Sequence, residues 1–382
     1  MKVSGDWLMR PETQAVFEVI EACGHSVWAV GGCVRDDLLG MPVRDIDLAT
    51  SATPAQVMEI GRAAGLKAVP TGIDHGTVTL ISGGAPYEVT TLRRDVDSDG
   101  RRATVAFGAS VEEDAGRRDF TVNALYADRT GTLLDPVDGL PDLRARRVRF
   151  VGDPDARVHE DYLRILRFFR FTALYGTPEN GIDADGLAAC AAGAEGLEKV
   201  SRERIGAEMK KLLSADDPAP AVASMQAAGV LMRVLPGADS ASLAVLVHHE
   251  AALDVVADPL RRLAVLGALE ADSRLRLSRA ESAKLDLLQR LTGDTSGLAE
   301  VAWRHGADCA RDVALLRAAA LGEEIAFDLD AQIELGVAAV FPVAAADLMP
   351  DFTGPALGAK LAELEAQWIA SGFSLDKAAL LA

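Results

Sequence analysis

Patterns typical of β-strands occur only in the first third of this 382-residue chain, which limits the folds open to it. Short apolar or alternating runs, separated by turn residues, predict strands at residues 27–30, 43–49, 77–81 and 87–92. From about residue 155 onward, the apolar residues recur with helical spacing instead. The sequence therefore predicts an α+β N-terminal part, with a small mixed sheet and helices, followed by an all-α remainder.

Composition excludes several classes of protein. With 49% hydrophobic residues, the chain is too apolar to be disordered over most of its length. No apolar run reaches the ~18–20 residues that a membrane-spanning helix needs, and the first residues show no secretory signal. The four cysteines are far apart and include no CxxC pair. We therefore expect neither a disulfide framework nor a zinc site, and a cytoplasmic location.

The charge of the chain is unevenly distributed. A net charge of −18 argues, taken alone, against a nucleic-acid partner, because phosphate binding requires a basic surface. Residues 144–170, however, hold eight arginines against four acidic residues. Residues 216–382 hold 13 basic and 24 acidic residues, so the last part of the chain is the acidic one.

The first candidate site combines two motifs about a dozen residues apart. Gly31 and Gly32 follow a predicted strand, where glycine lets the backbone approach a phosphate with free N–H groups, and Arg35 can add a charged contact. Asp45 and Asp47 occupy alternate positions of the next predicted strand, so both carboxylates are expected on one face. Two such carboxylates can bind Mg²⁺, which shares its oxygen ligands with substrate phosphates.

Two later segments supply further candidates for the same site. Glu88 adds a third carboxylate if its strand pairs beside the first, and is otherwise an exposed strand residue. Arg118 lies in a charged triplet that runs into an apolar stretch, where it can reach a triphosphate or ribose. Asp119 and Asn123 would orient it. The alternative is an Arg–Asp pair at the start of a helix.

A third motif lies on a helix predicted over residues 160–173. Asp161 and Arg164 are one turn apart there and can touch, and Arg167 and Arg170 follow at three-residue steps. Cytosine and adenine both present an amine donor beside a ring-nitrogen acceptor, whereas guanine and uracil present the reverse order. A fixed Asp–Arg pair would therefore admit C and A; the alternative is a salt-bridged amphipathic helix.

Other segments are interpreted from their composition. The long, charged segment 93–116 is predicted to be a mobile loop, of the kind that is often functional. The turn at 135–139 is a candidate hinge, and the arginines of 144–149 either contact phosphate or are only solvated. We expect His248 and His249 to be a packed or surface pair.

Taken in order, these motifs resemble those of the class II tRNA nucleotidyltransferase / poly(A) polymerase family, which includes the CCA-adding enzymes. The resemblance rests on Gly-Gly-x-Val-Arg-Asp, Asp-x-Asp, Tyr-Glu-Val-Thr-Thr-Leu-Arg, Arg-Arg-Asp-Phe-Thr-Val-Asn-Ala, Asp-Pro-x-x-Gly and Glu-Asp-x-x-Arg-x-x-Arg. It is specific to about residue 213 and diffuse from there to about residue 340. It implies a nucleotidyltransferase head at 1–138, a helical neck at 139–214, and a helical, tRNA-binding body and tail at 215–382.

The resemblance also implies an activity, the template-independent addition of C, C and A from CTP and ATP to the 3′ end of tRNA. Asp45 and Asp47 would bind Mg²⁺, as two ions, and Glu88 would complete the catalytic carboxylates. The residues implied to contact the nucleotide are Gly31, Gly32, Arg35, Arg118, Asp161, Arg164, Arg167 and Arg170. Because the C-terminal half is acidic, tRNA recognition is expected to rest on shape and a local basic track.

Several alternatives stay open at this point. Within the family they are a poly(A) polymerase and an enzyme that adds only CC or only A. CC-adding relatives have a shortened segment before Arg-Arg-Asp, whereas residues 93–116 are full length, and poly(A) polymerases of the family usually have a basic C-terminal region. More distant alternatives are a small-molecule nucleotidyltransferase and an inactive RNA-binding module. The inactive module would have no reason to keep both Asp45 and Asp47.

Overall fold

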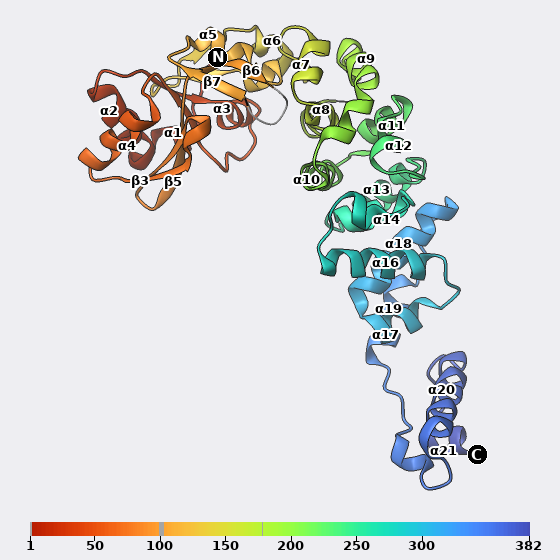
Figure 1. Ribbon diagram of the computed structural model, residues 1–382. Coiled ribbons are helices and arrows are strands. Elements are labelled where there is room, and N and C mark those ends of the chain that lie inside the picture. The colour runs from red at the N-terminus through yellow and green to blue at the C-terminus, as the bar shows by residue number, and fades with distance from the viewer. Residues whose placement is uncertain (1, 99–102, 178) are drawn as a thin grey trace. The chain divides into compact units, whose positions relative to one another are not determined.

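The computed structural model describes residues 2–98, 103–177 and 179–382, which form two compact units. Unit 1 comprises the chain up to Ser240 together with Leu269–Arg276, and unit 2 comprises Ala241–Ala268 and Leu277–Ala382. The main sheet is confined to the first third, and the rest of the chain is mostly helical (Figure 1). The predicted fold class, a small mixed sheet with helices and then a helical remainder, is confirmed. The division into head, neck and body stays a prediction.

The sheet of unit 1 has the strand order β3-β4-β5-β2-β1-β8-β9. Adjacent strands of the sheet run antiparallel, except that β2 and β5 run parallel. Val78, Leu80 and Val89 are fully buried, and their alternation along the strands places one sheet face in the core. The strands are β1 (Val27–Val30), β2 (Asp47–Thr50), β3 (Lys67–Gly72), β4 (Thr77–Ser82), β5 (Ala85–Thr91), β8 (Tyr126–Ala127) and β9 (Leu133–Leu134).

Short helices pack around this sheet. Thr53 and Gln56 form a capping box at the start of α4, and Pro54 occupies the first helical turn, so the helix begins where its sequence signals predict. Helices α2 and α4 both contact β4. The N-terminal helices are α1 (Asp6–Met9), α2 (Pro11–Ala22), α3 (Gly32–Leu38), α4 (Pro54–Ala63) and the short η1 (Ile73–His75).

Two local predictions are wrong. The segment 93–116, predicted as a loop, contains the paired strands β6 (Arg93–Ser98) and β7 (Ala103–Phe107) and then helix α5 (Val111–Gly116); residues 99–102 lie outside the described residues. This two-stranded ladder is separate from the main sheet, so its charged sequence lacks the apolar alternation of a core strand. The strand predicted at 43–49 begins only at Asp47, because its neighbours pair with it only from there.

The rest of unit 1 is largely helical. Phe120, Phe150, Phe168 and Phe171 form an aromatic cluster that packs α8 against the segments around residues 120 and 150. The elements are η2 (Thr121–Asn123), α6 (Gly139–Arg144), α7 (Pro154–Glu160), α8 (Leu163–Tyr175), α9 (Ala184–Ala192), η3 (Ala194–Lys199), α10 (Arg202–Leu213), α11 (Ala219–Ala227), α12 (Val230–Val234) and α15 (Ala271–Arg274).

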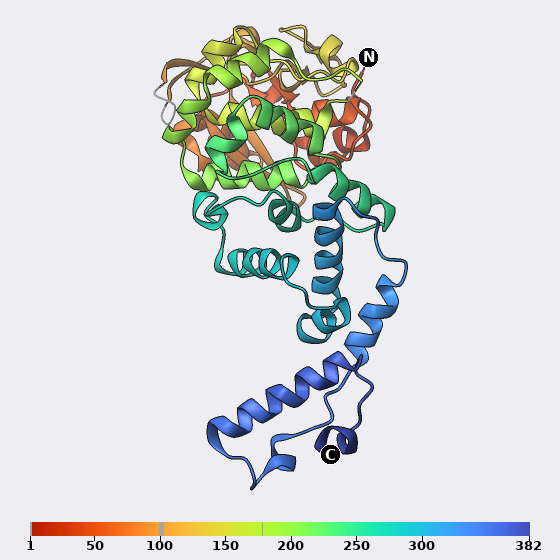
Figure 2. The same cartoon turned by 90° about the vertical axis from the view of Figure 1, so that its right-hand side faces the viewer.

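Unit 2 has two apolar centres. One surrounds Val313, Leu315 and Leu316 of α18, and the other joins Trp368 of α20 to neighbouring aromatic residues, with α21 beside α20 (Figure 2). Its helices are α13 (Leu243–Ala252), α14 (Pro259–Val265), α16 (Arg279–Thr292), α17 (Leu298–His305), α18 (Ala307–Leu321), α19 (Leu329–Ala338), η4 (Ala345–Leu348), α20 (Gly354–Ala370) and α21 (Lys377–Leu381).

Two sequence expectations bear on unit 2 and on the chain as a whole. His249 is buried and its Nε2 lies 3.0 Å from the backbone oxygen of Glu323, whereas His248 is exposed, so one histidine of the pair is packed and the other lies on the surface. None of the helices in the described ranges is both long and apolar enough to cross a membrane.

Candidate active site

Three carboxylates gather where strands β2 and β5 run side by side. Asp47 is the first residue of β2, and the parallel register places it directly beside Glu88 of β5. The next residues along, Leu48 and Val89, are fully buried and fix this register through the core. Glu88 therefore adopts the predicted position. Asp45, however, precedes the strand, so the prediction that it shares a strand face with Asp47 is wrong.

The three carboxylates nevertheless act on one another. Burial and the negative charges of Glu88 and Asp45 raise the pKa of Asp47 to about 6, against the opposing effect of Arg118. In the parts of the chain that the structure describes, no three or more His, Cys, Asp or Glu side chains form a ready metal site. Mg²⁺ commonly binds one or two carboxylates and completes its shell with water and substrate phosphates. This donor set fits that mode.

Gly31 forms a tight connection between β1 and α3. Its φ of 71° lies in the left-handed region that glycine adopts without strain. A side chain there would also meet Arg118 Nη1 at 3.4 Å and the backbone oxygen of Asn123 at 3.5 Å. The Gly31 N–H donates to the Leu125 carbonyl at 3.1 Å, so it is not the free donor that the sequence predicts. Gly32 begins α3.

Arg35 is buried and its guanidinium is engaged within the protein. Nη1 donates to Asn123 Oδ1 at 2.5 Å, Nη2 donates to the Tyr175 hydroxyl at 2.6 Å, and Nε donates to Asp36 at 2.8 Å. The guanidinium also lies over the Tyr175 ring, 3.9 Å from its centre. Arg35 therefore joins α3 to η2 and to the end of α8. The predicted contact with phosphate is replaced here by these three partners.

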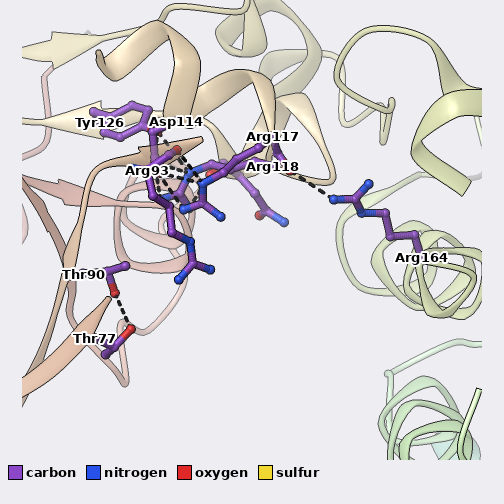
Figure 3. Close-up of polar contacts among 9 residues, drawn as sticks. Thr77, Thr90, Arg93, Asp114, Arg117, Arg118, Tyr126 and Arg164 are labelled. Atoms are coloured by element: carbon purple, nitrogen blue, oxygen red, sulfur yellow. Dashed lines mark hydrogen bonds and ion pairs between the residues drawn. The ribbon is translucent and has the colours of Figure 1, made fainter. Parts of the chain in front are cut away.

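Arg118 is held by an acidic residue that the sequence reasoning missed. Asp114, on α5, is almost fully buried and binds Arg117 at 2.6 Å and Arg118 at 3.1 Å (Figure 3). The Tyr126 hydroxyl donates to Asp114 at 2.7 Å and accepts from Arg118 Nε at 3.1 Å. The spacing of Asp114, three and four residues before the arginines, is the signal that could have revealed it.

The predicted pair of Asp161 and Arg164 is not formed. Helix α7 ends at Glu160 and Asp161 is extended, with φ −152° and ψ 104°, so these two residues are not on one helix. Asp161 instead accepts from Arg204 at 2.6 Å, and Arg164 donates to Glu160 at 2.5 Å. Arg164 also donates to the Arg117 carbonyl at 3.1 Å, so it reaches from α8 to the end of α5 (Figure 3).

Arg167 and Arg170 are also paired with carboxylates. Asp119 is the partner of Arg167, at 2.7 Å from Nε and 2.5 Å from Nη2, and Asn123 donates to the same carboxyl group at 3.0 Å. Arg170 pairs with Glu208 of α10 at 2.6 Å. Asp119 and Asn123 therefore contact Arg167 and Arg35 and do not orient Arg118 as a pair.

The hydrogen bonds and ion pairs of Arg35, Asn123, Arg167 and Arg170 form one connected network in unit 1. This network links α3 through η2 to α8, and α8 to α10, so it connects the Gly-Gly motif with the Arg-rich helix. Tyr175 and Arg204 were missed by the sequence reasoning, since nothing in their spacing from the motifs marks them. Carboxylates can bind a metal ion that contacts phosphates, and arginines can pair with phosphate oxygens. Together, such side chains are typical of a site that binds a nucleotide triphosphate.

Comparison with known families agrees with this fold and site. Residues 27–149 match a family model described as the poly A polymerase head domain. Residues 181–242 match a second, described as a probable RNA and SrmB-binding site of polymerase A. The N-terminal part is thus similar to a poly A polymerase head domain. The resemblance seen in the motifs is confirmed, and the two matched segments are similar to those of the poly(A) polymerase family.

Individual relatives narrow the similarity further. The chain is 42% identical over 218 residues to mouse mitochondrial CCA tRNA nucleotidyltransferase 1, a match that covers 55% of this chain and 50% of the relative. It is 44% identical over 204 residues to the CCA-adding enzyme of Latilactobacillus sakei, covering 53% and 50%. These matches span about half the length of the curated relatives.

A solved structure resembles nearly the whole chain. The crystal structure of the Bacillus stearothermophilus CCA-adding enzyme in complex with CTP superposes with a TM-score of 0.72 at 28% identity. The similarity covers 95% of this chain and 93% of that one. The fold is therefore shared beyond the segments that match in sequence.

Proposed function

We propose that this chain adds C, C and A to the 3′ end of tRNA, without a template, using CTP and ATP. The observation that carries the proposal is the register that sets Asp47 beside Glu88, with Asp45 two residues before and Arg118 close enough to affect Asp47. The relatives named for CCA addition and the related structure with CTP support the choice of reaction.

Mg²⁺ is the proposed cofactor, as two ions. Asp45 and Asp47 would hold it, with Glu88 as the third carboxylate. Burial, and after it repulsion from Glu88 and Asp45, raises the pKa of Asp47 to about 6, and a bound cation would relieve that repulsion. When bound, such ions lower the pKa of an attacking hydroxyl and neutralise charge on the leaving phosphates. The protein supplies the rigid strand edge that fixes the carboxylates.

The arginines would bind and select the nucleotide. Arg118, held by Asp114 and Tyr126, is oriented close to the carboxylates and can neutralise a triphosphate. Asp161 and Arg164 are now directed at Arg204 and Glu160, and they would have to turn from these partners to face one base as a pair. Base selection is therefore proposed to include a rearrangement at this junction.

A primer-extension assay tests the proposal. A tRNA transcript that lacks its 3′ end is incubated with Mg²⁺ and with CTP, ATP or both, and the products are resolved to single nucleotides. Addition of two nucleotides with CTP and three with both supports CCA addition. A long run of A would identify a poly(A) polymerase, and a stop after two nucleotides with both substrates would identify a CC-adding enzyme.

One variant ties the activity to the carboxylates. Asp47→Asn should lower incorporation of both nucleotides roughly a thousandfold, since a metal contributes several kcal/mol to transition-state stabilisation. Glu59→Gln, an exposed change on α4, is the matched control and should retain activity. CTP addition at the unmodified rate in Asp47→Asn would refute the metal assignment.

A further inference from the structure

Unit 1 contains a basic hollow away from the carboxylates. It has a volume of about 190 Å³ and lies among η3, α10, α12 and α15. Three arginines from three different helices line it, namely Arg202, Arg233 and Arg274. Among the residues that line it, all within the described ranges, Glu198 is the only acidic one. The lining is therefore net positive in a chain whose charge is −18.

The arginines that line the hollow have N–H groups available to a ligand. Arg202 donates through Nη1 to the Ser273 carbonyl at 3.3 Å, which leaves its other N–H groups for a ligand. Arg274 forms no side-chain hydrogen bond or ion pair with any residue that the structure describes. Arg233 pairs with Glu195 and Glu198, but those side chains are 81% and 75% exposed, and such surface pairs exchange at little cost.

Helix α10 begins at the hollow and adds to its positive potential. Val200, Arg202 and Ile205 line the hollow on either side of Ser201, the residue that precedes the helix. The Ser201 side chain does not cap the helix, and the Glu203 carboxylate accepts from its own backbone N–H. The other N–H groups of the first turn keep their hydrogen-bonding capacity. The positive end of the helix dipole reinforces the arginines there.

We propose that this hollow binds a backbone phosphate of the RNA whose 3′ end is extended. The proposal rests on the proposed function, which supplies an RNA substrate. A backbone phosphate carries one negative charge and matches a small, net positive lining. A nucleotide triphosphate would bring Mg²⁺, which needs carboxylate ligands, and Glu198 is a single carboxylate already paired with Arg233. Arg202 and Arg233 also fall within the segment that matches the RNA-binding family model.

Two elements that line the hollow, α10 and η3, also contact Asp161 and Tyr162, which lie between α7 and α8. Arg204, two residues after Arg202 on α10, binds Asp161. Gly196 of η3 packs so closely against the Tyr162 ring that a Cβ there would overlap it. A phosphate held in the hollow would therefore bind to the same α10 and η3 backbone that positions Asp161. RNA backbone and base selection are in this way physically connected.

Salt-dependent binding of the tRNA transcript tests the proposal on the full chain. Arg274→Ala should remove about one phosphate contact, so the slope of log K against log salt should fall by about one. That slope corresponds to a loss of affinity of roughly tenfold at 0.1 M salt. Arg274→Lys should keep most of the affinity. Arg276→Ala is the matched control, since Arg276 is 63% exposed, pairs with Glu203 and does not line the hollow.

Each outcome decides between the proposals. Unchanged tRNA affinity and salt slope in Arg274→Ala would overturn the phosphate site, as would an equal loss in Arg276→Ala. A higher KM for CTP with unchanged tRNA affinity would assign the hollow to nucleotide and overturn the RNA assignment. If the unmodified chain binds tRNA but adds no nucleotide, the proposed function fails while the hollow is still tested by the variants. If it binds no tRNA, both fail.

Discussion

Buried carboxylates decide where the arginines of unit 1 point. Asp142 is an example: it is fully buried, accepts from Thr121 at 2.7 Å, and binds Arg147 at 2.6 Å and Arg149 at 2.9 Å. The sequence left these arginines as either phosphate-binding or solvated. Arg147 and Arg149 are partly solvated, and in addition they pair with Asp142, which would be costly to bury without a partner.

The pH dependence of stability follows from Asp142. Burial raises its pKa, but Thr121, Arg147 and Arg149 outweigh that effect and hold the pKa below its usual range. The stabilisation is therefore complete above the unfolded-state pKa of about 3.9 and is lost as the pH falls through the lower folded value. Asp142→Asn should lower the free energy of unfolding by about 1–3 kcal/mol at pH 7.

The measurement is denaturant unfolding of both proteins between pH 7 and pH 2.5. The difference between Asp142→Asn and the unmodified chain should shrink below about pH 4, where the carboxyl group of the unfolded chain begins to take up a proton while the native one stays ionised. The exposed substitution Asp351→Asn should show no such convergence. A difference that stays constant down to pH 2.5 would contradict the argument.

Base selection is also predicted at the scale of one residue. Asp161→Ala should relax the choice of nucleotide more than it slows transfer, by about 1–3 kcal/mol of discrimination, because the carboxylate accepts from the base amine. Incorporation of all four nucleotides at matched concentrations measures this. Glu59→Gln, an exposed change on α4, is the control. Lost rate with unchanged C and A preference would show that Asp161 only holds Arg204.

Among the elements, the break between α7 and α8 matters most for the site. The apolar pattern of residues 160–173 continues across it, but Asp161 is extended and its carboxylate accepts from the Leu163 N–H at 3.1 Å, at the start of α8. Tyr162 packs against Gly196 of η3 beside the break. The interruption turns Asp161 away from Arg164 and toward Arg204.

Gly196→Ala tests the importance of that packing. A Cβ would overlap the Tyr162 ring, so the substitution should cost about 1–3 kcal/mol of stability and alter nucleotide preference together. Thermal unfolding and the four-nucleotide assay measure the two effects. Gly293→Ala is the control, since its nearest neighbour would be a backbone oxygen 3.9 Å away. Normal stability and selectivity in Gly196→Ala would show that Tyr162 moves aside freely.

At the scale of the whole molecule, the two units are stabilised by different interiors. Unit 1 has a sheet and the aromatic cluster, whereas unit 2 has helical apolar centres and, beside them, a buried network of charges. Glu250 accepts from Arg261 at 2.7 Å and from Arg262 at 2.8 Å, and Asp312 accepts from Arg261 at 2.6 Å. All four residues are buried, so removing the charge of Glu250 leaves two buried guanidinium groups with less compensation.

Glu250→Gln should therefore destabilise unit 2 by about 3–5 kcal/mol. Amide hydrogen exchange should speed up in α13, α14 and α18, while β2 and β5 of unit 1 stay protected. Asp330→Asn removes an exposed ion pair with Arg311 and should change exchange little. Uniform acceleration through both units in Glu250→Gln would show that they unfold as one.

The sequence by itself determined the fold class and the resemblance to a family. Spacing of apolar residues is a local property, so the sheet-then-helix order and the boundaries of α4 could be predicted. The order of the motifs carried the resemblance to poly(A) polymerase head domains that the comparison confirmed. Glu88 as the partner of Asp47 followed from a strand pairing that the pattern made plausible.

Only the tertiary structure decided which charges meet. Asp161 contacts Arg204, 43 residues away, and Arg35 contacts Tyr175, 140 residues away, and neither spacing leaves a periodic signal. The end of α7 and the late start of β2 depend on neighbouring elements, which remove Asp161 and Asp45 from the regular structure that local spacing predicts. A buried charge without a partner is energetically costly, so each of these side chains is paired. The fold determines which partner is close enough.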